Sequence, residues 1–575
     1  MLDVILRGGT VVDGTGAPPV RGDVGITDGR VVAVGDVGED ARRTVDVPEQ
    51  IVAPGFIDPH THYDAQLLWD PTASPSNLHG VTTVIGGNCG FTLAPVDPDD
   101  ADYLRRMMAQ VEGMPLEALE QGLDWDWRDF GEYLARVDGG LGVNAGFLVG
   151  HCALRRLTMG ADAVGAAATD EQIGQMRAQL GASLDAGGLG FSTTRAYTHS
   201  DGDGQPVPSR HATPDEVLAL CEETGRHAGT TLEAIADGCL NGFSDDEVDL
   251  FTRMSVAANR PLNWNILTVD AHEPERTQSQ LDASTRAAAN GGRLVALTMP
   301  ILVGMNMSFL TYCAFHLFPG WRDVLELPIP ERMARLRDPA VRHSLDERAH
   351  SPEAGVVRRL AAWDRYEIGD TYSPENERLR GRTVADIADE RGTPPFDTLL
   401  DVVLADELRT VLWPSPTDDD PDSWKMRADI WQDDRVLIGG SDAGAHLDRM
   451  CGAPYPTAFL ADCLRGRELL PVETAVRLMT SAPADLFGLR DRGRIGPGSI
   501  ADLVVFDPGS VSAGPIETVR DLPGGAARLV ADARGVTRVF VDGVETVVDG
   551  SPTGDLPGRV LRSGRDTETV AAGIG

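Results

Sequence analysis

The chain has 575 residues, of which 42% are hydrophobic and 24% charged, a balance typical of a globular protein rather than a disordered one. Its formal net charge of −37 argues against nucleic acid and anionic membranes as partners, because both bind clustered Lys and Arg. The sequence contains no run of about 18 uncharged apolar residues, so no transmembrane helix is predicted. Its seven cysteines stand at irregular spacings, which predicts a reducing cytoplasm rather than a disulfide framework.

Residues 1–52 are predicted to form short strands joined by tight turns. The stretches DVILRGGTVVDGTG and GDVGITDGRVVAVGD alternate apolar and polar positions around Gly-Gly, Asp-Gly and Gly-Thr-Gly turns. This beginning has neither a basic n-region nor a long apolar h-region, so it predicts no signal peptide. Residues 496–575 repeat the pattern in ADLVVFDPGSV and GVTRVFVDGVETVVDG. We expect both ends to form one β-sandwich domain; two unrelated hairpins are the alternative.

From about residue 53 to 495, short apolar runs alternate with helical stretches. The helical stretches TDEQIGQMRAQLGASLDAG and PDEVLALCEETGRH each open with an N-cap residue and an acidic first turn. Buried strands spaced by helices predict an α/β fold, and about eight such units predict a (β/α)8 TIM barrel. Residues 97–138 and 305–395 are expected to be insertions, either a lid over the site or surface elaboration. The strand-like runs are GVTTVIGG, VNAGFLVGH, GLGFSTT, GTTLEAIA, PLNWNILT, GRLVALTMP and DRVLIGGSD.

His60 and His62 follow the apolar stretch IVAPGFID, where a strand is expected to end. Residues i and i+2 of an extended segment point the same way, so both imidazoles can bind one ion. Two polar residues in a surface turn are the alternative. Asp442, in RVLIGGSDAGAH, also follows an apolar strand. A carboxylate and two imidazoles form a plausible site for a divalent metal with open positions for water.

Cys89, in TTVIGGNCGF, lies at another predicted strand end. In a barrel the chemistry collects at the carboxyl ends of the strands, which makes this thiol a further candidate ligand. A small buried apolar residue is the alternative reading of a cysteine.

Several motifs together resemble the amidohydrolase superfamily, and more narrowly its N-acyl-D-amino-acid deacylase (D-aminoacylase) branch, from residue 1 to about 562. The resemblance implies that His60, His62 and Asp442 bind one metal and that Asp442 is also the general base. Most relatives bridge two metals with a carboxylated lysine, whereas this branch uses a cysteine, which implies Cys89. The only lysine, Lys425, agrees with this, because DDPDSWKMRAD predicts a polar loop. The motifs are GFIDPHTHYDAQ, GVTTVIGGNCGF, VGHCALR, GGSDAGAH and TSAPADLFGLRDRGRIGPGSIADLVVFDP.

The chain departs from this family at the ends of strands five and six, where two further metal-binding histidines are expected. The matching stretches GTTLEAIADG and RPLNWNIL place Thr231 and Asn265 there, and neither is a good zinc ligand. One Zn²⁺ on the side of the histidine pair is therefore favoured over two. The alternative donors for a second ion are Glu233, His227 and His272.

Four further residues are predicted to contact the substrate. His151, in VNAGFLVGHCALR, lies at a strand end, with a hydrogen-bonded structural histidine as the alternative. By resemblance, Tyr197 matches a tyrosine near the reacting carbonyl. Arg195 could bind a substrate carboxylate bidentately or form an intramolecular ion pair. His446, four residues after Asp442, is expected to orient a ligand or contact the substrate.

These residues predict a metal-dependent hydrolase that cleaves a non-peptide C–N (amide) bond. Metal-activated water would attack the carbonyl, with Asp442 as general acid and base. The resemblance implies that the small-molecule substrate is an N-acyl-D-amino acid or a similar N-acyl compound. A cyclic-amide or lactam hydrolase on the same barrel is one alternative, because fold alone does not choose the substrate. A catalytically impaired binding protein that lost part of the metal site is the other.

Overall fold

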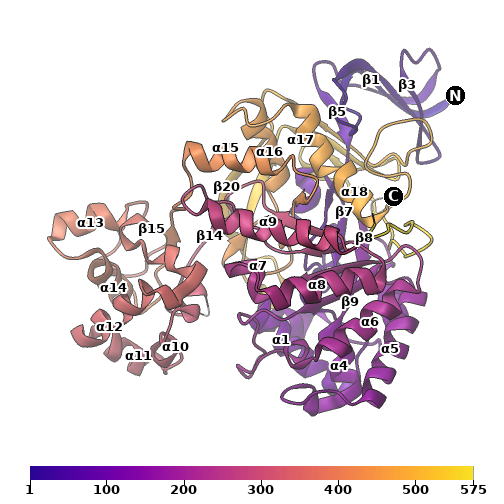
Figure 1. Cartoon of the computed structure of the whole chain (residues 1–575). Helices are drawn as coiled ribbons and strands as arrows, with labels where there is room; N and C mark the ends of the chain where they lie inside the picture. The colour runs from indigo at the N-terminus through magenta and orange to yellow at the C-terminus, as the bar shows by residue number, and fades with distance from the viewer. Residues whose placement is uncertain (312, 574–575) are drawn as a thin grey trace. The chain divides into compact units, whose positions relative to one another are not determined.

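The computed structural model describes residues 1–311 and 313–573. The chain divides into two compact units, one combining Met1–Ile301 with the chain from Asp422 onward, the other consisting of Leu302–Pro421 (Figure 1). Within the described ranges, no helix is both long and apolar enough to cross a membrane.

One sheet of the first unit takes its strands from both ends of the chain. The early strands are β1 (Leu2–Val11), β2 (Val20–Thr27), β3 (Arg30–Gly35), β4 (Ala41–Asp46) and β5 (Ile51–Pro54). The late strands are β19 (Leu503–Phe506), β22 (Val536–Val541), β23 (Val544–Val548) and β24 (Ser551–Pro552). The order is β24-β23-β22-β19-β5-β1-β2-β3, and β4 pairs with β1. The two ends meet where β5 runs antiparallel to β19, so both terminal segments share this sheet.

The turns of this sheet follow the glycine pattern of the sequence with one exception. Asp28 and Gly29 both have positive φ and connect β2 to β3. Asp542 and Gly543 do the same between β22 and β23, as Asp-Gly predicts for a tight hairpin. The Gly-Gly pair at residues 8–9 was expected to form a turn, but it lies inside β1. There the register against β2 shifts, because a glycine with positive φ accommodates a bulge within a strand.

Two parallel sheets form the middle of the first unit. One contains β6 (Phe56–Asp58), β7 (Val81–Gly86) and β8 (Asn144–Phe147), in that order. The other contains, in spatial order, β17 (Val436–Ile438), β13 (Leu294–Thr298), β12 (Leu262–Trp264), β11 (Thr231–Ile235), β10 (Gly190–Thr194) and β9 (Val149–Gly150). Only Leu148 separates β8 from β9 along the chain. The pairings establish an α/β fold, while closure of the two sheets into one barrel stays a prediction.

These strands are buried on both faces, as parallel strands covered by helices usually are. Every residue of β6, β7, β10 and β11 is buried. The covering helices include α5 (Asp170–Asp185), α6 (Pro214–Gly225) and α8 (Asp245–Ala258) (Figure 1). Each begins after a hydroxyl N-cap, namely Thr169, Thr213 and Ser244, whose side-chain oxygen accepts an N–H of the first turn. The predicted N-cap of α5, Thr169, is therefore confirmed, whereas the N-cap of α6 is Thr213, one residue before the predicted stretch that opens with Pro214.

Three short helices lie between β7 and β8, in the segment 97–138 that was predicted to be an insertion. They are α1 (Ala101–Val111), α2 (Leu116–Gly122) and α3 (Phe130–Val137). Lys425, expected in a loop, lies in helix α15 (Pro421–Ile430), because Trp424 and Arg427 give that polar stretch a buried face. The lysine is not among the residues that line the cavity described below.

The second unit is mainly helical and has a core of its own. Its helices include α11 (Ile329–Arg337), α12 (Pro339–Ala349) and α14 (Pro395–Ala405), and β15 (Tyr366–Ile368) pairs antiparallel with β16 (Leu412–Pro414). Phe315, Trp321, Trp363 and Phe396 pack against one another in the core. The predicted insertion at 305–395 falls within this unit.

Candidate metal centre

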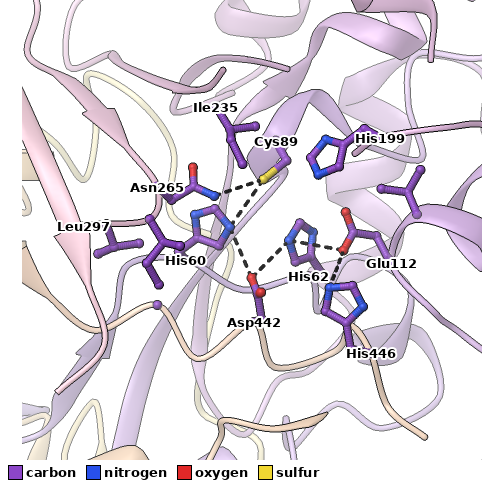
Figure 2. Close-up of a pocket in the computed structure, with 13 residues that line it drawn as sticks. His60, His62, Cys89, Glu112, His199, Ile235, Asn265, Leu297, Asp442 and His446 are labelled. Carbon is purple, nitrogen blue, oxygen red and sulfur yellow. Dashed lines mark hydrogen bonds and ion pairs between the residues drawn. The ribbon is translucent and has the colours of Figure 1, made fainter. Parts of the chain in front are cut away.

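A small cavity of about 130 Å³ lies at the carboxyl ends of the parallel strands in the first unit (Figure 2). The loops after β6, β7, β12 and β17 contribute to its wall together with Ile235 at the end of β11 and Leu297 of β13, as the general position of chemistry in such folds predicts. Apart from polar groups, the wall contains aliphatic side chains. The lining residues are His60, His62, Cys89, Val111, Glu112, His199, Ile235, Asn265, Ile266, Leu297, Gly440, Asp442 and His446.

His60 and His62 follow β6 and point into this cavity (Figure 2). Backbone hydrogen bonds hold the segment, since Thr61 N–H donates to Ile85 O at 2.9 Å and His62 N–H to Ala443 O at 2.8 Å. The two rings meet edge to face with centroids 5.3 Å apart, and both side chains are buried. The i, i+2 spacing thus places both imidazoles on one side of the segment, as the sequence predicts.

Asp442 reaches the same point from the end of β17. Gly439 and Gly440 precede it with φ of 123° and 80°, backbone conformations that L side chains rarely adopt. Its Oδ1 lies 3.3 Å from His60 Nε2 and 3.5 Å from His62 Nε2. Burial alone would raise the pKa of this carboxyl, but the two imidazoles hold it well below its ordinary value. With 32% of its side chain exposed, the carboxylate is open to the cavity.

Cys89 flanks His60, with its Sγ 3.6 Å from His60 Nε2. The Asn265 amide donates to the same sulfur at 3.5 Å, and Glu233 Oε1 lies 4.0 Å from it. Glu233 Oε2 accepts the Cys89 N–H at 2.7 Å, which fixes a backbone with positive φ. Burial, and then the charge of Glu233, raise the pKa of the Cys89 thiol well above its ordinary value. A thiolate at this position therefore needs a cation beside it.

Three of the separations among these donor atoms have the lengths expected between ligands of one tetrahedral zinc ion. Zinc–nitrogen and zinc–oxygen bonds of about 2.0–2.1 Å give edges of about 3.4 Å, and a zinc–sulfur bond of about 2.3 Å gives an N–S edge of about 3.6 Å. The 3.3, 3.5 and 3.6 Å separations among His60, His62, Asp442 and Cys89 match these edges. A His60–His62–Cys89 triad has one donor atom from each residue, all within 4.8 Å of one another. Among the described residues, no Lys or Arg belongs to the cavity lining to compensate the buried acids.

Two titratable residues of the lining escaped the sequence-based search. Glu112, directly after α1, has its Oε2 3.5 Å from His62 Nε2 and 4.0 Å from His446 Nε2. Burial raises the pKa of its carboxyl well above the ordinary value. His199 Nδ1 forms a hydrogen bond of 2.8 Å with Thr194 Oγ1, and burial lowers the pKa of His199 to about 3. Neither follows an apolar strand directly, so the strand-end rule could not find them.

The two positions at which the family's missing histidines were expected, Asn265 and Thr231, lie in different places in the structure. Asn265 lies in the cavity wall, but Thr231 is at the opposite, amino end of β11, where its hydroxyl donates to Pro261 O at 3.4 Å. Glu233, two residues later, is the β11 residue beside Cys89. Of the alternative donors, His227 binds Asp185 and Glu223, and His272 lies in an exposed turn.

Three predicted substrate contacts lie outside the cavity lining. His151 is fully buried, with its ring nitrogens 2.9 Å from Thr193 Oγ1 and Glu216 Oε1, which favours the structural role over substrate contact. The Arg195 guanidinium donates to the Ala212 carbonyl at 2.9 Å, and burial lowers its pKa. Tyr197 has 37% of its surface exposed. The substrate-binding roles of Arg195 and Tyr197 stay predictions, and His446 does line the cavity.

Similar proteins cover nearly the whole chain. The D-aminoacylase of Alcaligenes xylosoxydans xylosoxydans is 29% identical over 569 residues, which is 97% of each chain. A crystal structure of D-aminoacylase matches 98% of this chain and all of its own, with 27% identity and a TM-score of 0.63. A solved N-acyl-D-glutamate deacylase from Bordetella bronchiseptica, with zinc and a phosphonate inhibitor, matches to the same extent at 25% identity and a TM-score of 0.63. Since the Amidohydrolase family model also matches residues 43–553, the chain belongs to the amidohydrolase family, among relatives that are D-aminoacylases and N-acyl-D-amino-acid deacylases.

Proposed function

We propose that this protein is a metal-dependent hydrolase that cleaves the amide C–N bond of an N-acyl-D-amino acid or a similar N-acyl compound. One observation carries the proposal: Asp442 Oδ1 lies within 3.3 and 3.5 Å of two imidazole nitrogens inside a small cavity at the strand ends. The similar deacylase from Bordetella bronchiseptica was solved with zinc and a phosphonate that mimics the tetrahedral intermediate of its reaction. The same chemistry suits the donor set of this cavity.

The ion in this proposal is Zn²⁺, held by His60, His62, Asp442 and Cys89. When bound, it acts as a Lewis acid that polarises the substrate carbonyl and makes water a stronger acid near neutral pH. The protein's own side chains orient the ligands and move the proton. Both imidazoles offer Nε2, while each Nδ1 is buried with no hydrogen-bond partner in the described ranges, so the rings are oriented by packing.

Asp442 moves the proton. Its half-open carboxylate takes a proton from the attacking water and then delivers it to the departing amide nitrogen. Without metal, His60 and His62 hold the pKa of this carboxyl well below its ordinary value, so Asp442 enters the site as a carboxylate. His446, on the opposite side of the cavity wall from Cys89, is the proposed contact for the substrate (Figure 2).

A single ion is part of the proposal. A second ion on the Cys89 side would need two further strong donors, and the neighbours there are the Glu233 carboxylate and the Asn265 amide. Glu233 Oε2 is already committed to the Cys89 N–H at 2.7 Å, and the Asn265 amide turns its NH₂ group toward the sulfur. A neutral amide that presents donors rather than its oxygen cannot ligate a cation in this orientation.

The frame that we propose is a (β/α)8 barrel over residues 53–495, with 1–52 and 496–575 as one β-sandwich. Two contacts between the ends of the first and last parallel strands support closure. Asp442 N–H donates to His60 O at 3.3 Å, and Ser441 N–H donates to Asp58 Oδ1 at 3.3 Å. These contacts bring β17 and β6 together at the rim where the donor atoms converge.

A reducing compartment such as the cytoplasm suits this site. Cys89, Cys152, Cys221, Cys239, Cys451 and Cys463 are free thiols. A thiol that must bind metal as a thiolate is lost once it is oxidised.

The test is a substrate profile of the zinc-loaded protein. N-acyl-D-amino acids with different side chains would be compared with their L enantiomers and with cyclic imides. Release of free D-amino acid, abolished by a chelator and restored by Zn²⁺, is the expected result. Preference for cyclic imides would favour the lactam-hydrolase alternative. Absence of turnover with metal bound would overturn hydrolysis altogether.

A further inference from the structure

Glu112 enters the metal centre from outside the parallel strands. Helix α1 is anchored by its buried residues Leu104, Met107 and Met108, and Glu112 is the first residue beyond its end. The Glu112 N–H donates to Met108 O at 3.0 Å, and its carbonyl accepts the N–H of His446. The backbone is thus fixed on both sides, and the side chain points into the cavity between His62 and His446 (Figure 2).

The carboxylate of Glu112 is buried without a permanent cation. Only 3% of the residue is exposed, and its ion pairs within the described ranges are with His62 and His446. A buried carboxylate is costly unless a charge or hydrogen bonds compensate it. Two neutral imidazoles supply hydrogen bonds only if their nitrogens carry hydrogens, so the state of these ring nitrogens decides whether the carboxylate is compensated.

His62 Nε2 faces two carboxylate oxygens at the same distance. Asp442 Oδ1 and Glu112 Oε2 each lie 3.5 Å from this nitrogen. A ring nitrogen that binds a metal uses its lone pair and carries no hydrogen, so it can donate to neither oxygen. Both separations are close to the edge of about 3.4 Å between two ligands of one tetrahedral zinc ion. A shared cation therefore accounts for the convergence of all three atoms.

We propose that Glu112 is a ligand of the metal ion that His60, His62 and Asp442 hold, an inference that rests on the proposed metal-dependent function. Glu112 would bind the ion on the side of His62, whose Nε2 lies 3.5 Å from its Oε2, and Cys89 on the side of His60. The segment 97–138 is then an essential part of the metal centre rather than surface elaboration.

The experiment measures metal binding rather than turnover. The purified full chain and its Glu112→Gln, Glu112→Asp and Glu120→Gln variants are stripped of metal and titrated with Zn²⁺ against a chromophoric chelator. The Co²⁺-loaded forms are then compared by visible absorption, which reports the number and type of ligands. Glu120, exposed on the neighbouring helix α2, is the matched control for loss of one negative charge. Thermal unfolding of the metal-free forms shows whether each variant is folded.

The proposal predicts that Glu112→Gln lowers zinc affinity by at least about 100-fold, beyond the roughly 10- to 100-fold that loss of an outer partner costs. It also predicts a changed Co²⁺ spectrum, an intermediate effect for Glu112→Asp, and parent behaviour for Glu120→Gln. An unchanged Co²⁺ spectrum and affinity in folded Glu112→Gln would overturn the Glu112 assignment and leave the proposed function standing. A parent protein that binds neither Zn²⁺ nor Co²⁺ would overturn both.

Discussion

The Oδ1 of Asp442 lies 3.3 Å from the Nε2 of His60, although the two residues follow β17 and β6, the last and the first strands along the chain of the two central parallel sheets. No local feature of either strand sets this distance. It depends on the meeting of β17 and β6 at one rim, where the backbone N–H of Asp442 also donates to the carbonyl of His60. The chemistry of the site is therefore a direct consequence of the topology.

Replacing Asp442 with Asn should lower turnover by about 10²- to 10⁴-fold, the usual contribution of a general base. The amide cannot accept the proton of the attacking water, whereas His60, His62 and Cys89 keep most of the metal in place. The measurement is kcat together with zinc content for the parent and the variant. Unchanged turnover in the Asn variant would remove Asp442 from the mechanism.

Acid should destabilise the fold through His79, which lies outside the lining of the metal centre. Its Nε2 is 2.9 Å from the Ala531 carbonyl, so it carries the hydrogen, and Nδ1 then accepts from Thr457 at 2.7 Å. Burial lowers the pKa of His79 to about 4 from an ordinary 6.5. Below pH 6.5 the unfolded chain binds the proton more readily, so stability is lost as the pH falls from 6.5 to 4. The loss is about 3 kcal/mol.

The measurement for His79 is the free energy of unfolding by urea between about pH 7 and pH 4. The control is His79→Gln, whose amide can still donate to the carbonyl of Ala531. This variant should be less stable at neutral pH but should lack the part of the pH dependence that His79 contributes. Identical pH profiles for parent and variant would contradict the assignment.

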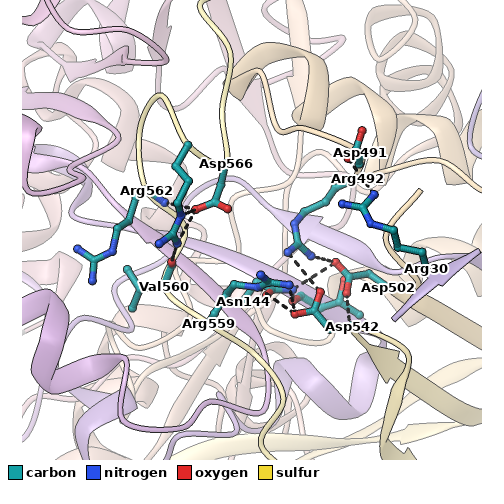
Figure 3. A network of polar contacts seen from close by, with 12 residues as sticks. Arg30, Asn144, Asp491, Arg492, Asp502, Asp542, Arg559, Val560, Arg562 and Asp566 are labelled. Atoms are coloured by element: carbon teal, nitrogen blue, oxygen red, sulfur yellow. Dashed lines mark hydrogen bonds and ion pairs between the residues drawn. The ribbon is translucent and has the colours of Figure 1, made fainter. Parts of the chain in front are cut away.

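A buried ion network joins the terminal sheet to the parallel strands and should be sensitive to loss of a single charge (Figure 3). Arg492 pairs with Asp502 and lies 3.5 Å from Asp542, while Asn144 at the start of β8 donates to Asp502 at 3.2 Å. Arg559 also binds Asp542, with its Nε 3.0 Å from Oδ2. Both Arg492 and Asp502 are buried.

Arg492→Met should destabilise the protein by about 3–5 kcal/mol, because it leaves the Asp502 carboxylate buried without its cation. A double variant that combines Arg492→Met with Asp502→Asn should lose less stability than this single variant, since no unpaired charge remains. Urea unfolding of the parent and both variants makes the comparison. A double variant that is less stable than the single one would contradict the unpaired-charge account and show that Asp502 stabilises the fold through its hydrogen bonds with Asn144 and the Asp542 N–H.

Much of the site could be predicted because its residues follow local signals. His60, His62, Cys89 and Asp442 each stand just beyond an apolar run that forms a buried parallel strand. Burial on both faces makes such runs apolar throughout, so the first polar residues after them mark the rim. The same signal at His151 also marked a strand end, but its partners Thr193 and Glu216 turn that ring away from the cavity lining.

The places of other site residues depend on long-range geometry, which no local sequence pattern encodes. Glu112 follows a helix, and its place beside His62 results from how the segment between β7 and β8 packs. The comparison of Thr231 with Glu233 shows a different difficulty. Because strand residues alternate between two faces, Thr231 and Glu233 face the same side, and the register alone decides which one lies beside Cys89.

The most direct test of the central claim is metal stoichiometry, measured by elemental analysis of the parent and of the His60→Ala, His62→Ala double variant. Both imidazoles face one position with Asp442, and the Cys89 side offers Asn265 and a hydrogen-bonded Glu233 in place of further histidines. We predict one zinc ion per chain in the parent and none in the double variant. Two ions per parent chain, or one ion that survives the double change, would contradict a single centre built on the histidine pair.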